Sequence, residues 1–243
     1  MNLFPAKELK EKMNNLAIIP ARSGSKGLKN KNILNLCGKP LMYYSITAAI
    51  KSGVFEEVIV STDSSEYAEI AKECGAKIPF LRSKENSSDK ASSWDTVLEV
   101  LKCYEKIGKS FENICLLQPT SPLRDETDIK NAYDLIKKGA KAAVSVCESE
   151  HSPLLVNSLP DDRSMENFLS ESGNKRRQDS GKFYRLNGAI YFVNTEFLKE
   201  NTFIYRKGCR ALIMSGSHSV DIDSELDFLY AQTLMSYQRE KNI

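Results

Sequence analysis

The sequence has no excess of either charge, because 34 lysine and arginine residues are balanced by 32 aspartate and glutamate residues. Proteins that wrap DNA or RNA need a broad basic surface, so this balance argues against a nucleic-acid partner. No apolar run approaches the roughly 18 residues that a membrane-spanning helix needs. The first 15 residues lack the continuous apolar stretch of a signal peptide. We therefore expect a cytoplasmic protein without a membrane partner.

Cysteine and histidine motifs are missing as well. None of the six cysteines belongs to a C-x-x-C pair, so we expect no zinc site and interpret the thiols as reduced and mostly buried. The only two histidines, His151 and His218, have no nucleophile motif near them in the sequence. We assign both to structural or surface roles rather than to catalysis.

Short apolar runs alternate with segments of helical periodicity over the first 147 residues. The length fits one large α/β domain or two small ones. The expected strands are residues 16–20, 58–60, 78–81, 114–117 and 142–146, and the expected helices include residues 41–51, the segment from an Asp63-x-x-Glu66 capping box to Gly75, and the segments around residues 97–104 and 129–136. This alternation predicts a parallel sheet with helices on both faces, whose ligands bind at the carboxyl ends of the strands.

The alternation breaks after residue 147. Residues 148–185 are polar and punctuated by proline, and this length is too great for a simple connector. The segment fits a lid, an extended arm or a surface for a partner. After it we expect a strand at residues 187–194, a short helix at 195–200, a strand at 210–214 and a final helix.

The loop after the first strand looks suited to an anion. Gly24 and Gly27 allow the backbone to approach a ligand closely, and Arg22, Lys26 and Lys31 supply the charge that a di- or triphosphate needs. The loop matches neither the P-loop nor the dinucleotide fingerprint. Its G-S-K-G also fits the G-x-x-G of KH domains, but that motif joins helices, whereas this loop follows a strand.

An acidic pair lies near the end of the chain. In an extended segment Asp221 and Asp223 point to the same side, while Ile222 points to the core. Two carboxylates on one side, completed by phosphate oxygens and water, suit Mg²⁺. The alternative is that one of the two aspartates caps the helix that begins near Ser224.

Two further segments are suited to substrate recognition. Residues 118–124 (QPTSPLR) are stiffened by two prolines, and Gln118 can both donate and accept hydrogen bonds; the Asp125-x-x-Asp128 pair that follows fits a helix cap. Residues 175–185 are basic, and their arginines, Arg176, Arg177 and Arg185, could bind a carboxylate.

Taken in order, the segments ARSGSKGLKNKN, VIVSTDSSEYAEIAKECGA, RSKENSSDKASS, LLQPTSPLR, NGAIYF and SVDIDSELD resemble the CMP-N-acylneuraminate synthetases, from about residue 16 to the last helix. The resemblance implies a three-layer α/β/α nucleotidyltransferase fold with a mostly parallel sheet. It also implies one domain over residues 1–243, with residues 148–185 as a dimerisation arm, and the formation of CMP-sialic acid and pyrophosphate from CTP and a sialic acid. Residues 1–15 lie outside it as an N-terminal extension without an assigned function.

The resemblance also implies roles for single residues. The nucleotide would be held by Arg22, Ser25, Lys26, Lys31, Asn32, Arg82 and Ser93, the sugar by Gln118, Thr120, Arg177, Asn187 and Tyr191, and Mg²⁺ by Asp221 and Asp223. Of these, Arg22, Lys31, Asp221 and Asp223 would act in catalysis. Phe203 and Tyr205 would reach the pocket of the second subunit of a homodimer.

One segment departs from the family pattern. Arg177-Gln178 is followed by Asp179-Ser180-Gly181, where many bacterial relatives have Leu-Pro. Because this segment borders the expected sugar site, N-acetylneuraminate, legionaminate, pseudaminate and Kdo all remain open as substrates. A nucleotide- or RNA-binding module without catalysis is the alternative from another class.

Overall fold

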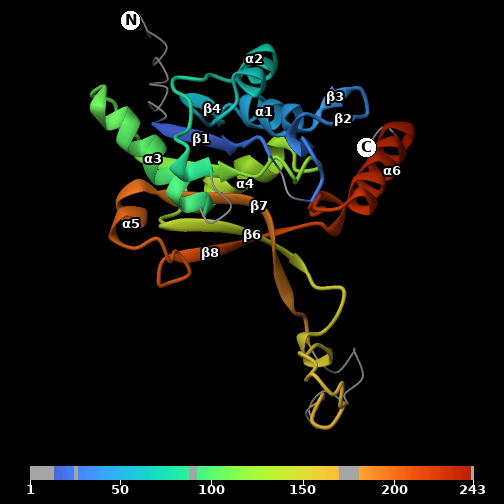
Figure 1. Ribbon diagram of the computed structural model, residues 1–243. Coiled ribbons are helices and arrows are strands. Elements are labelled where there is room, and N and C mark those ends of the chain that lie inside the picture. Colours follow the sequence, from blue (N-terminus) through green and yellow to red (C-terminus); the bar gives the residue numbers. More distant parts are fainter. Residues whose placement is uncertain (1–13, 25–26, 88–91, 170–180, 242–243) are drawn as a thin grey trace, which may run out of the picture.

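The computed structural model describes residues 14–24, 27–87, 92–169 and 181–241. A six-stranded sheet forms its centre, in the order β4-β1-β5-β7-β6-β8 (Figure 1). The strands of this sheet are β1 (Asn15–Pro20), β4 (Glu57–Ser61), β5 (Asn113–Leu117), β6 (Ala142–Glu148), β7 (Tyr184–Asn194) and β8 (Cys209–Met214). Strands from both halves of the chain thus share one sheet, and a small hairpin of β2 (Asn35–Leu36) and β3 (Lys39–Pro40) lies outside it.

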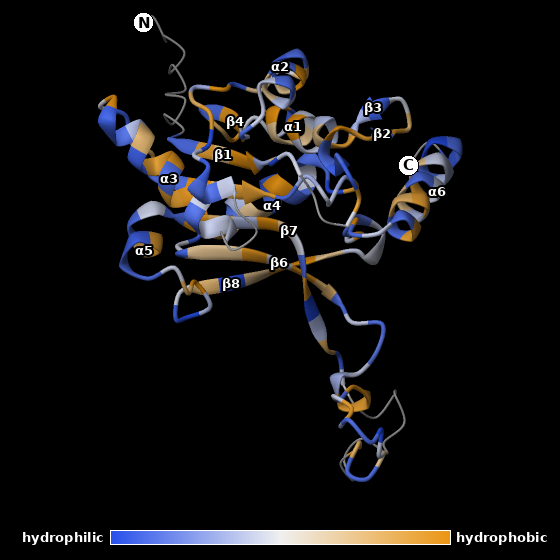
Figure 2. Cartoon of the chain, viewed as in Figure 1, coloured by the Kyte–Doolittle hydropathy of each residue, from blue (hydrophilic) through white to orange (hydrophobic). Residues whose placement is uncertain are grey.

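Two helical layers cover the sheet. One apolar cluster joins one face to α1 (Leu41–Ser52), α2 (Ser65–Glu73) and α4 (Glu126–Lys137). A second cluster joins the opposite face to α3 (Ser93–Lys106) and α5 (Thr195–Glu200). The last helix, α6 (Glu225–Lys241), packs beside the β2–β3 hairpin and the start of α1 through a third cluster. Figure 2 shows the hydrophobic residues concentrated along the central strands. The expected three-layer α/β/α arrangement is therefore confirmed.

The sheet is mostly parallel, as expected, with one exception. β1 runs parallel to β4 and β5, and β6 runs parallel to β8. β7 runs antiparallel to both of its neighbours, β5 and β6. It therefore carries residues from late in the chain into the middle of the sheet.

Two local expectations are wrong. Residues 78–81 form no strand; only a single bridge between Ile59 and Lys77 continues the sheet edge there. Asp63 does not cap α2 either, because Ser64 is the N-cap and its hydroxyl accepts the hydrogen bond of the Tyr67 N–H. The carboxylate of Asp63 is instead directed toward the loop after β1.

The described residues 149–169, between β6 and β7, project away from the sheet (Figure 1) and contain one short turn of 3-10 helix, Pro153–Leu155. β6 leads into this projection and β7 leads out of it, so its two stems are strands of the central sheet. Among the described residues, the helices are too short or too polar to cross a membrane.

Candidate nucleotide-transfer site

A cavity of about 570 Å³ opens at the carboxyl ends of β1 and β5. This is the edge of the sheet where ligands bind in open parallel α/β folds. Its wall combines the loop after β1, the segment before α3, the end of β5 and the segment before α6. The lining residues are Pro20, Arg22, Gly27, Lys31, Asn32, Arg82, Asn86, Ser92, Ser93, Thr96, Gln118, Pro119, Thr120, Asp221 and Asp223.

The loop after β1 is held by a carboxylate from the neighbouring strand. Asp63, which follows β4, accepts hydrogen bonds from the backbone N–H of Ser23 at 2.8 Å and from its hydroxyl at 2.9 Å. Farther along the loop, the amide of Asn32 donates to the carbonyl of Arg22 at 3.1 Å. Both contacts fix the backbone near Arg22. The Arg22 guanidinium therefore reaches the cavity from a fixed backbone position.

Gly27 brings the same loop against the acidic pair. A Cβ atom at this position would lie 2.6 Å from the carbonyl oxygen of Asp223, closer than real Cβ contacts allow. A residue without a side chain is therefore needed here, so the glycine in the sequence has a packing reason. The contact joins the expected phosphate loop to the expected metal segment.

Lys31 completes this junction. Its ammonium donates to the backbone carbonyl of Ile222 at 2.7 Å and forms an ion pair with Asp223 at 2.9 Å. The Lys31 side chain is 13% exposed whereas that of Asp223 is 79% exposed. The cation is thus fixed at the cavity wall, between the carboxylate and the space that a ligand would occupy.

Asp221 is partly buried, and one of its carboxylate oxygens lacks a partner among the described residues. Its Oδ1 atom is buried and has no hydrogen-bond partner within the described chain. Burial raises the pKa of this carboxyl group, and the nearby charge of Asp223 adds to the effect, whereas a hydrogen bond with Thr120 opposes it. An inward-facing carboxylate oxygen without a donor fits a divalent cation, which prefers oxygen ligands. Ile222 between the two aspartates is fully buried, as the alternation of an extended segment predicts.

The alternative role of the acidic pair as a helix cap is not observed. The carboxylate of Asp227, inside α6, accepts from the backbone N–H groups of Asp223 and Ser224 at 3.1 and 2.8 Å. The hydroxyl of Ser224 in turn accepts from the Asp227 N–H at 3.3 Å. This capping leaves the side chains of Asp221 and Asp223 at the cavity.

The opposite wall is built around Arg82. Its guanidinium is buried and its Nε donates to the hydroxyl of Ser61 at 3.1 Å. Burial lowers the pKa of Arg82 to about 10, so the group stays charged at neutral pH. Next to it, Glu99 of α3 accepts from the Ser83 N–H and the Asn86 amide, both at 2.9 Å. These contacts organise the irregular segment before α3 that faces the phosphate loop.

The sugar-side residues expected from the sequence fall into two groups. Gln118 and Thr120 lie in the cavity wall. Asn187 is buried beneath it, and its amide oxygen accepts from the Ser145 hydroxyl at 2.6 Å while its nitrogen donates to the Ser219 hydroxyl at 2.8 Å. Asn187 is thus not among the residues that line the cavity, and its amide is engaged by protein groups; its role at the sugar stays a prediction.

Tyr191 is also outside the cavity lining. It stacks edge-on against Trp94 with ring centroids 5.9 Å apart. Burial raises the pKa of its phenol to about 12, with a further contribution from Tyr205. The phenol therefore stays protonated, and Tyr205 and Phe203, which contact each other, lie beyond it in partly exposed positions.

Nine expected residues thus meet in one cavity: Arg22, Lys31, Asn32, Arg82, Ser93, Gln118, Thr120, Asp221 and Asp223. Ser25, Lys26 and Arg177 lie outside the described residues. Sequence reasoning did not find Asp63, Asn86 or Thr96 as parts of the site. Asp63 closely follows a strand, which indicates a position at the ligand-binding edge of the sheet. Its spacing to Glu66 fits a helix cap equally well, so the sequence did not distinguish the two roles.

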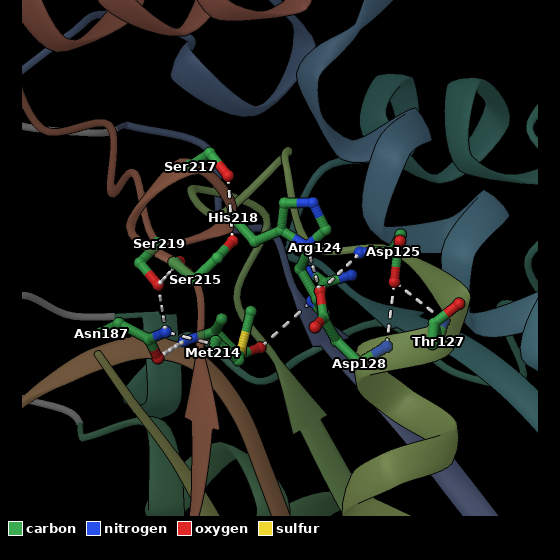
Figure 3. A network of polar contacts seen from close by, with 11 residues as sticks. Arg124, Asp125, Thr127, Asp128, Asn187, Met214, Ser215, Ser217, His218 and Ser219 are labelled. Carbon is green, nitrogen blue, oxygen red and sulfur yellow. Dashed lines mark hydrogen bonds and ion pairs between the residues drawn. The ribbon is translucent and has the colours of Figure 1, made fainter. Parts of the chain in front are cut away.

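A second polar group lies at the start of α4 (Figure 3). Ligand atoms of Asp125, Asp128 and His218 come within 4.8 Å of one another. Asp125 accepts from the N–H groups of Thr127 and Asp128, which makes it the N-cap of α4, as expected from the sequence. Asp128 contacts His218, at 2.8 Å. In this cluster, Asp125 therefore caps the helix, and Asp128 pairs with His218.

Comparison with known proteins agrees with this geometry. The family model described as "Cytidylyltransferase" matches residues 16–224. The chain is 41% identical over 229 residues to an N-acylneuraminate cytidylyltransferase of Escherichia coli O18:K1:H7, covering 93% of this chain but 52% of that protein. It is 34% identical to a CMP-N,N'-diacetyllegionaminic acid synthase of Legionella pneumophila, covering 94% of this chain and 99% of that one. The chain thus spans about half the length of the first relative and nearly all of the second.

Among solved structures, a CMP:2-keto-3-deoxy-manno-octonic acid synthetase complexed with CTP matches with a TM-score of 0.70 over 93% of this chain and 99% of that one. At 16% identity this likeness concerns the fold. The motifs at the cavity, the family model and the identity to the E. coli and Legionella proteins lead to one conclusion: the chain belongs to the cytidylyltransferase family, among the enzymes that resemble CMP-sialic acid synthetases.

Proposed function

We propose that this chain transfers CMP from CTP to the anomeric 2-hydroxyl of a nonulosonic acid, such as N-acetylneuraminate, and releases pyrophosphate. One observation carries the proposal: cations from the loop after β1 and the acidic pair before α6 face the same cavity as Gln118. The cations of the loop can bind a triphosphate, and the acidic pair can hold a divalent cation. Gln118 can bind the hydroxyl groups of an acceptor sugar.

Charge neutralisation explains the role of the cationic wall. Arg22 and Lys31 would bind the phosphate oxygens, and Gly27 holds the loop that carries them close against Asp223. Nucleotidyl transfer depends mainly on positioning and on stabilising charge that develops on the leaving group. Because Lys31 is already held by Asp223 and the Ile222 carbonyl, little reordering is needed when the phosphates bind.

The cytidine part fits the wall formed by Arg82 and Ser93. This wall and the phosphate loop line the same cavity, so one nucleotide could contact both. Arg82 is held by Ser61 at the end of β4, and Ser93 is the first residue of α3. Arg82 is thus anchored to the end of a strand, and Ser93 is fixed at the start of a helix.

The acidic pair would hold Mg²⁺. The buried, unpartnered Oδ1 of Asp221 and the exposed carboxylate of Asp223 supply the oxygen ligands that this ion prefers. When bound, the ion would polarise the α-phosphate and lower the pKa of the attacking hydroxyl. In the transfer the hydroxyl oxygen bonds to the α-phosphorus, the bond to pyrophosphate breaks, and the hydroxyl proton passes to solvent.

The acceptor would lie beside Gln118 and Thr120, with Arg177, outside the described residues, as the partner of its carboxylate. Gln118 can donate to and accept from sugar hydroxyls. Its place at the end of β5 puts it next to Asp221, so the acceptor hydroxyl and the α-phosphate would meet there.

Residues 148–185 are proposed as a dimerisation arm. The described part of the arm projects from the body (Figure 1), and several of its apolar side chains are exposed to solvent. The exposed apolar residues are Leu155, Val156, Leu159, Met165 and Leu169. Clustered exposed apolar side chains of this kind are typical of protein interfaces. In a homodimer they would be covered by a second copy.

Pyrophosphate release from CTP tests the reaction. The acceptors to compare are N-acetylneuraminate, N,N'-diacetyllegionaminate, pseudaminate and Kdo, each with Mg²⁺ and with EDTA. We expect release with at least one of the nonulosonic acids, dependent on the cation. Release with Kdo alone would show that the acceptor is Kdo and not a nonulosonic acid. If no acceptor gives release and the chain retains RNA on a filter, the proposed enzymatic function is wrong and the chain is a binding module.

Sedimentation tests the arm separately. The full chain is expected to sediment as a dimer and a chain lacking residues 150–183 as a monomer. A dimer that persists after the deletion, or a full chain that is monomeric at micromolar concentration, would contradict the proposed role.

A further inference from the structure

Apart from a hydrogen bond with Thr120, the position of the Asp221 carboxylate depends on the backbone around it, because its Oδ1 atom has no hydrogen-bond partner in the described chain. On its carboxyl-terminal side the backbone is fixed at the next residue. The N–H of Ile222 donates to the Thr120 carbonyl at 2.9 Å, its side chain is fully buried, and its carbonyl accepts from Lys31. This anchor joins the segment to β5 and to the phosphate loop.

On the amino-terminal side the anchor is a turn of 3-10 helix, Gly216–His218, which follows β8. Ser219 closes this turn: its hydroxyl donates to the Ser215 carbonyl at 2.6 Å and accepts from the Asn187 amide at 2.8 Å. Ser219 is 1% exposed, so these hydrogen bonds are shielded from water. They join the turn to β7.

His218 adds a contact to a different layer. Its Nδ1 lies 2.8 Å from Oδ2 of Asp128, in the first turn of α4 (Figure 3). Asp128 is held in place by the capping box, in which its carboxylate accepts from the N–H of Asp125 at 3.2 Å. His218 therefore contacts a carboxylate whose position is already fixed by the capping box of α4. Asp125 and the buried Arg124 are the other charged groups beside it.

We propose that His218 is a positioning residue for the transfer site: through Asp128 it fixes the turn that leads into Asp221 and so sets the geometry of the carboxylate that binds the divalent cation. This inference rests on the proposed function, because it takes Asp221 as a cation ligand. His218 is three residues before Asp221 and does not line the cavity. Its effect is thus on the position of a ligand, not on a reacting atom.

Cation affinity distinguishes positioning from general stabilisation. Mn²⁺ is titrated into the metal-free full chain, and the free ion is followed by its paramagnetic resonance signal, while thermal unfolding of the same samples is recorded. The variants are His218→Leu, which removes the contact, and His218→Asn, whose amide nitrogen can replace Nδ1. His151→Leu serves as the control, because His151 is exposed on the arm.

We expect His218→Leu to weaken Mn²⁺ binding about tenfold, the effect of losing one hydrogen bond to a charged group. His218→Asn should recover most of the affinity, and His151→Leu should match the wild type. In turnover assays, His218→Leu should need a correspondingly higher Mg²⁺ concentration for half-maximal rate, with a similar maximal rate at saturation.

The opposite result is also well defined. If His218→Leu lowers the unfolding temperature but keeps the Mn²⁺ affinity of the wild type, His218 is only structural and the proposal is wrong. If the wild type itself binds no Mn²⁺, the assignment of Asp221 fails and the proposal fails with it. CTP-dependent pyrophosphate release by the wild type would show in that case that the proposed function survives.

Discussion

A Cβ atom at Gly188 would lie 2.9 Å from Oε1 of Gln118, so the glycine leaves the space that this amide occupies. The same Cβ would lie 3.7 Å from a carboxylate oxygen of Asp221. Gly188 belongs to an irregular stretch of β7, where the register with β6 shifts between Val144 and Val146. The hydroxyl of Ser145 closes the irregularity by bonding to the N–H of Ile190 at 2.8 Å. The irregular stretch thus places a residue without a side chain next to two site residues, Gln118 and Asp221.

Replacing Gly188 by alanine should displace Gln118 and lower turnover. The positive φ of +75° adds backbone strain of about 1–2 kcal/mol. Gly108→Ala is the matched control, because Gly108 has φ +72° and open space around its Cβ position. We expect both variants to lose similar stability, but Gly188→Ala alone to lose kcat/KM for the sugar acid by tenfold or more. Equal kcat/KM values in the two variants would show that the contact with Gln118 is unimportant.

Asp63 should matter for nucleotide binding although it does not line the cavity. Asp63→Asn weakens the two hydrogen bonds that hold Ser23 at the start of the phosphate loop. Because such charged hydrogen bonds contribute about 1.5–3 kcal/mol each, we expect the KM for CTP to rise about tenfold. Asp134→Asn on the surface of α4, where the carboxylate only pairs with Lys137, is the control and should leave KM unchanged. An unchanged KM in Asp63→Asn would mean that the loop is ordered by other contacts.

Asp221 should reduce stability while it supports catalysis. Burial raises the pKa of its carboxyl group, so the ionised form is less favourable in the folded protein than in the unfolded chain when no cation is bound. We expect Asp221→Asn to raise the unfolding temperature of the metal-free protein by about 2–4 °C, which corresponds to about 1 kcal/mol for a chain of this size. Turnover should fall by at least about a hundredfold.

Asp223→Asn provides the contrast, because the side chain of Asp223 is mostly exposed and already paired with Lys31. This variant should lose activity without gaining stability. The prediction for Asp221 is wrong if calorimetry of the EDTA-treated proteins shows Asp221→Asn to be less stable than the wild type.

The pair of His218 and Asp128 should make stability depend on pH. The hydrogen bond and charge of Asp128 raise the pKa of His218 above its usual value of about 6.5. The pair therefore stabilises the folded state fully below pH 6.5, and this contribution is lost as the pH rises through the folded-state pKa. The free energy of unfolding in urea, measured for the wild type and His218→Leu from pH 5.5 to 9, should differ most at the acidic end. A difference that is constant over this range would exclude the ion pair as its source.

The sequence was sufficient for the parts of the fold that repeat a local pattern. The strand at residues 16–20, the helix expected at residues 41–51, and the capping box of Asp125 and Asp128 were each predicted from neighbouring residues and are confirmed. The same holds for the orientation of Asp221 and Asp223, because alternation in an extended segment depends only on the backbone.

Contacts between distant segments were less accessible. Asp63 fits a helix cap by local pattern, and only the tertiary structure shows that Ser23, forty residues earlier, takes its carboxylate. Asn187 was expected at the sugar because of a resemblance in sequence, but its partners Ser145 and Ser219 come from two other segments. The antiparallel direction of β7 likewise depends on how the chain returns from the arm, which no local pattern specifies.

The central position of β7 also has a consequence for folding. β5 pairs with β1 on one side, and its other edge receives β7, which is made only after the arm has been synthesised. Until then the apolar segment of β5 (Asn113–Leu117) presents open backbone groups, the kind of edge that other chains can join. The half of the sheet formed first is thus the half at risk of aggregation, and insertion of β7 removes that risk as it places Gly188 beneath the site.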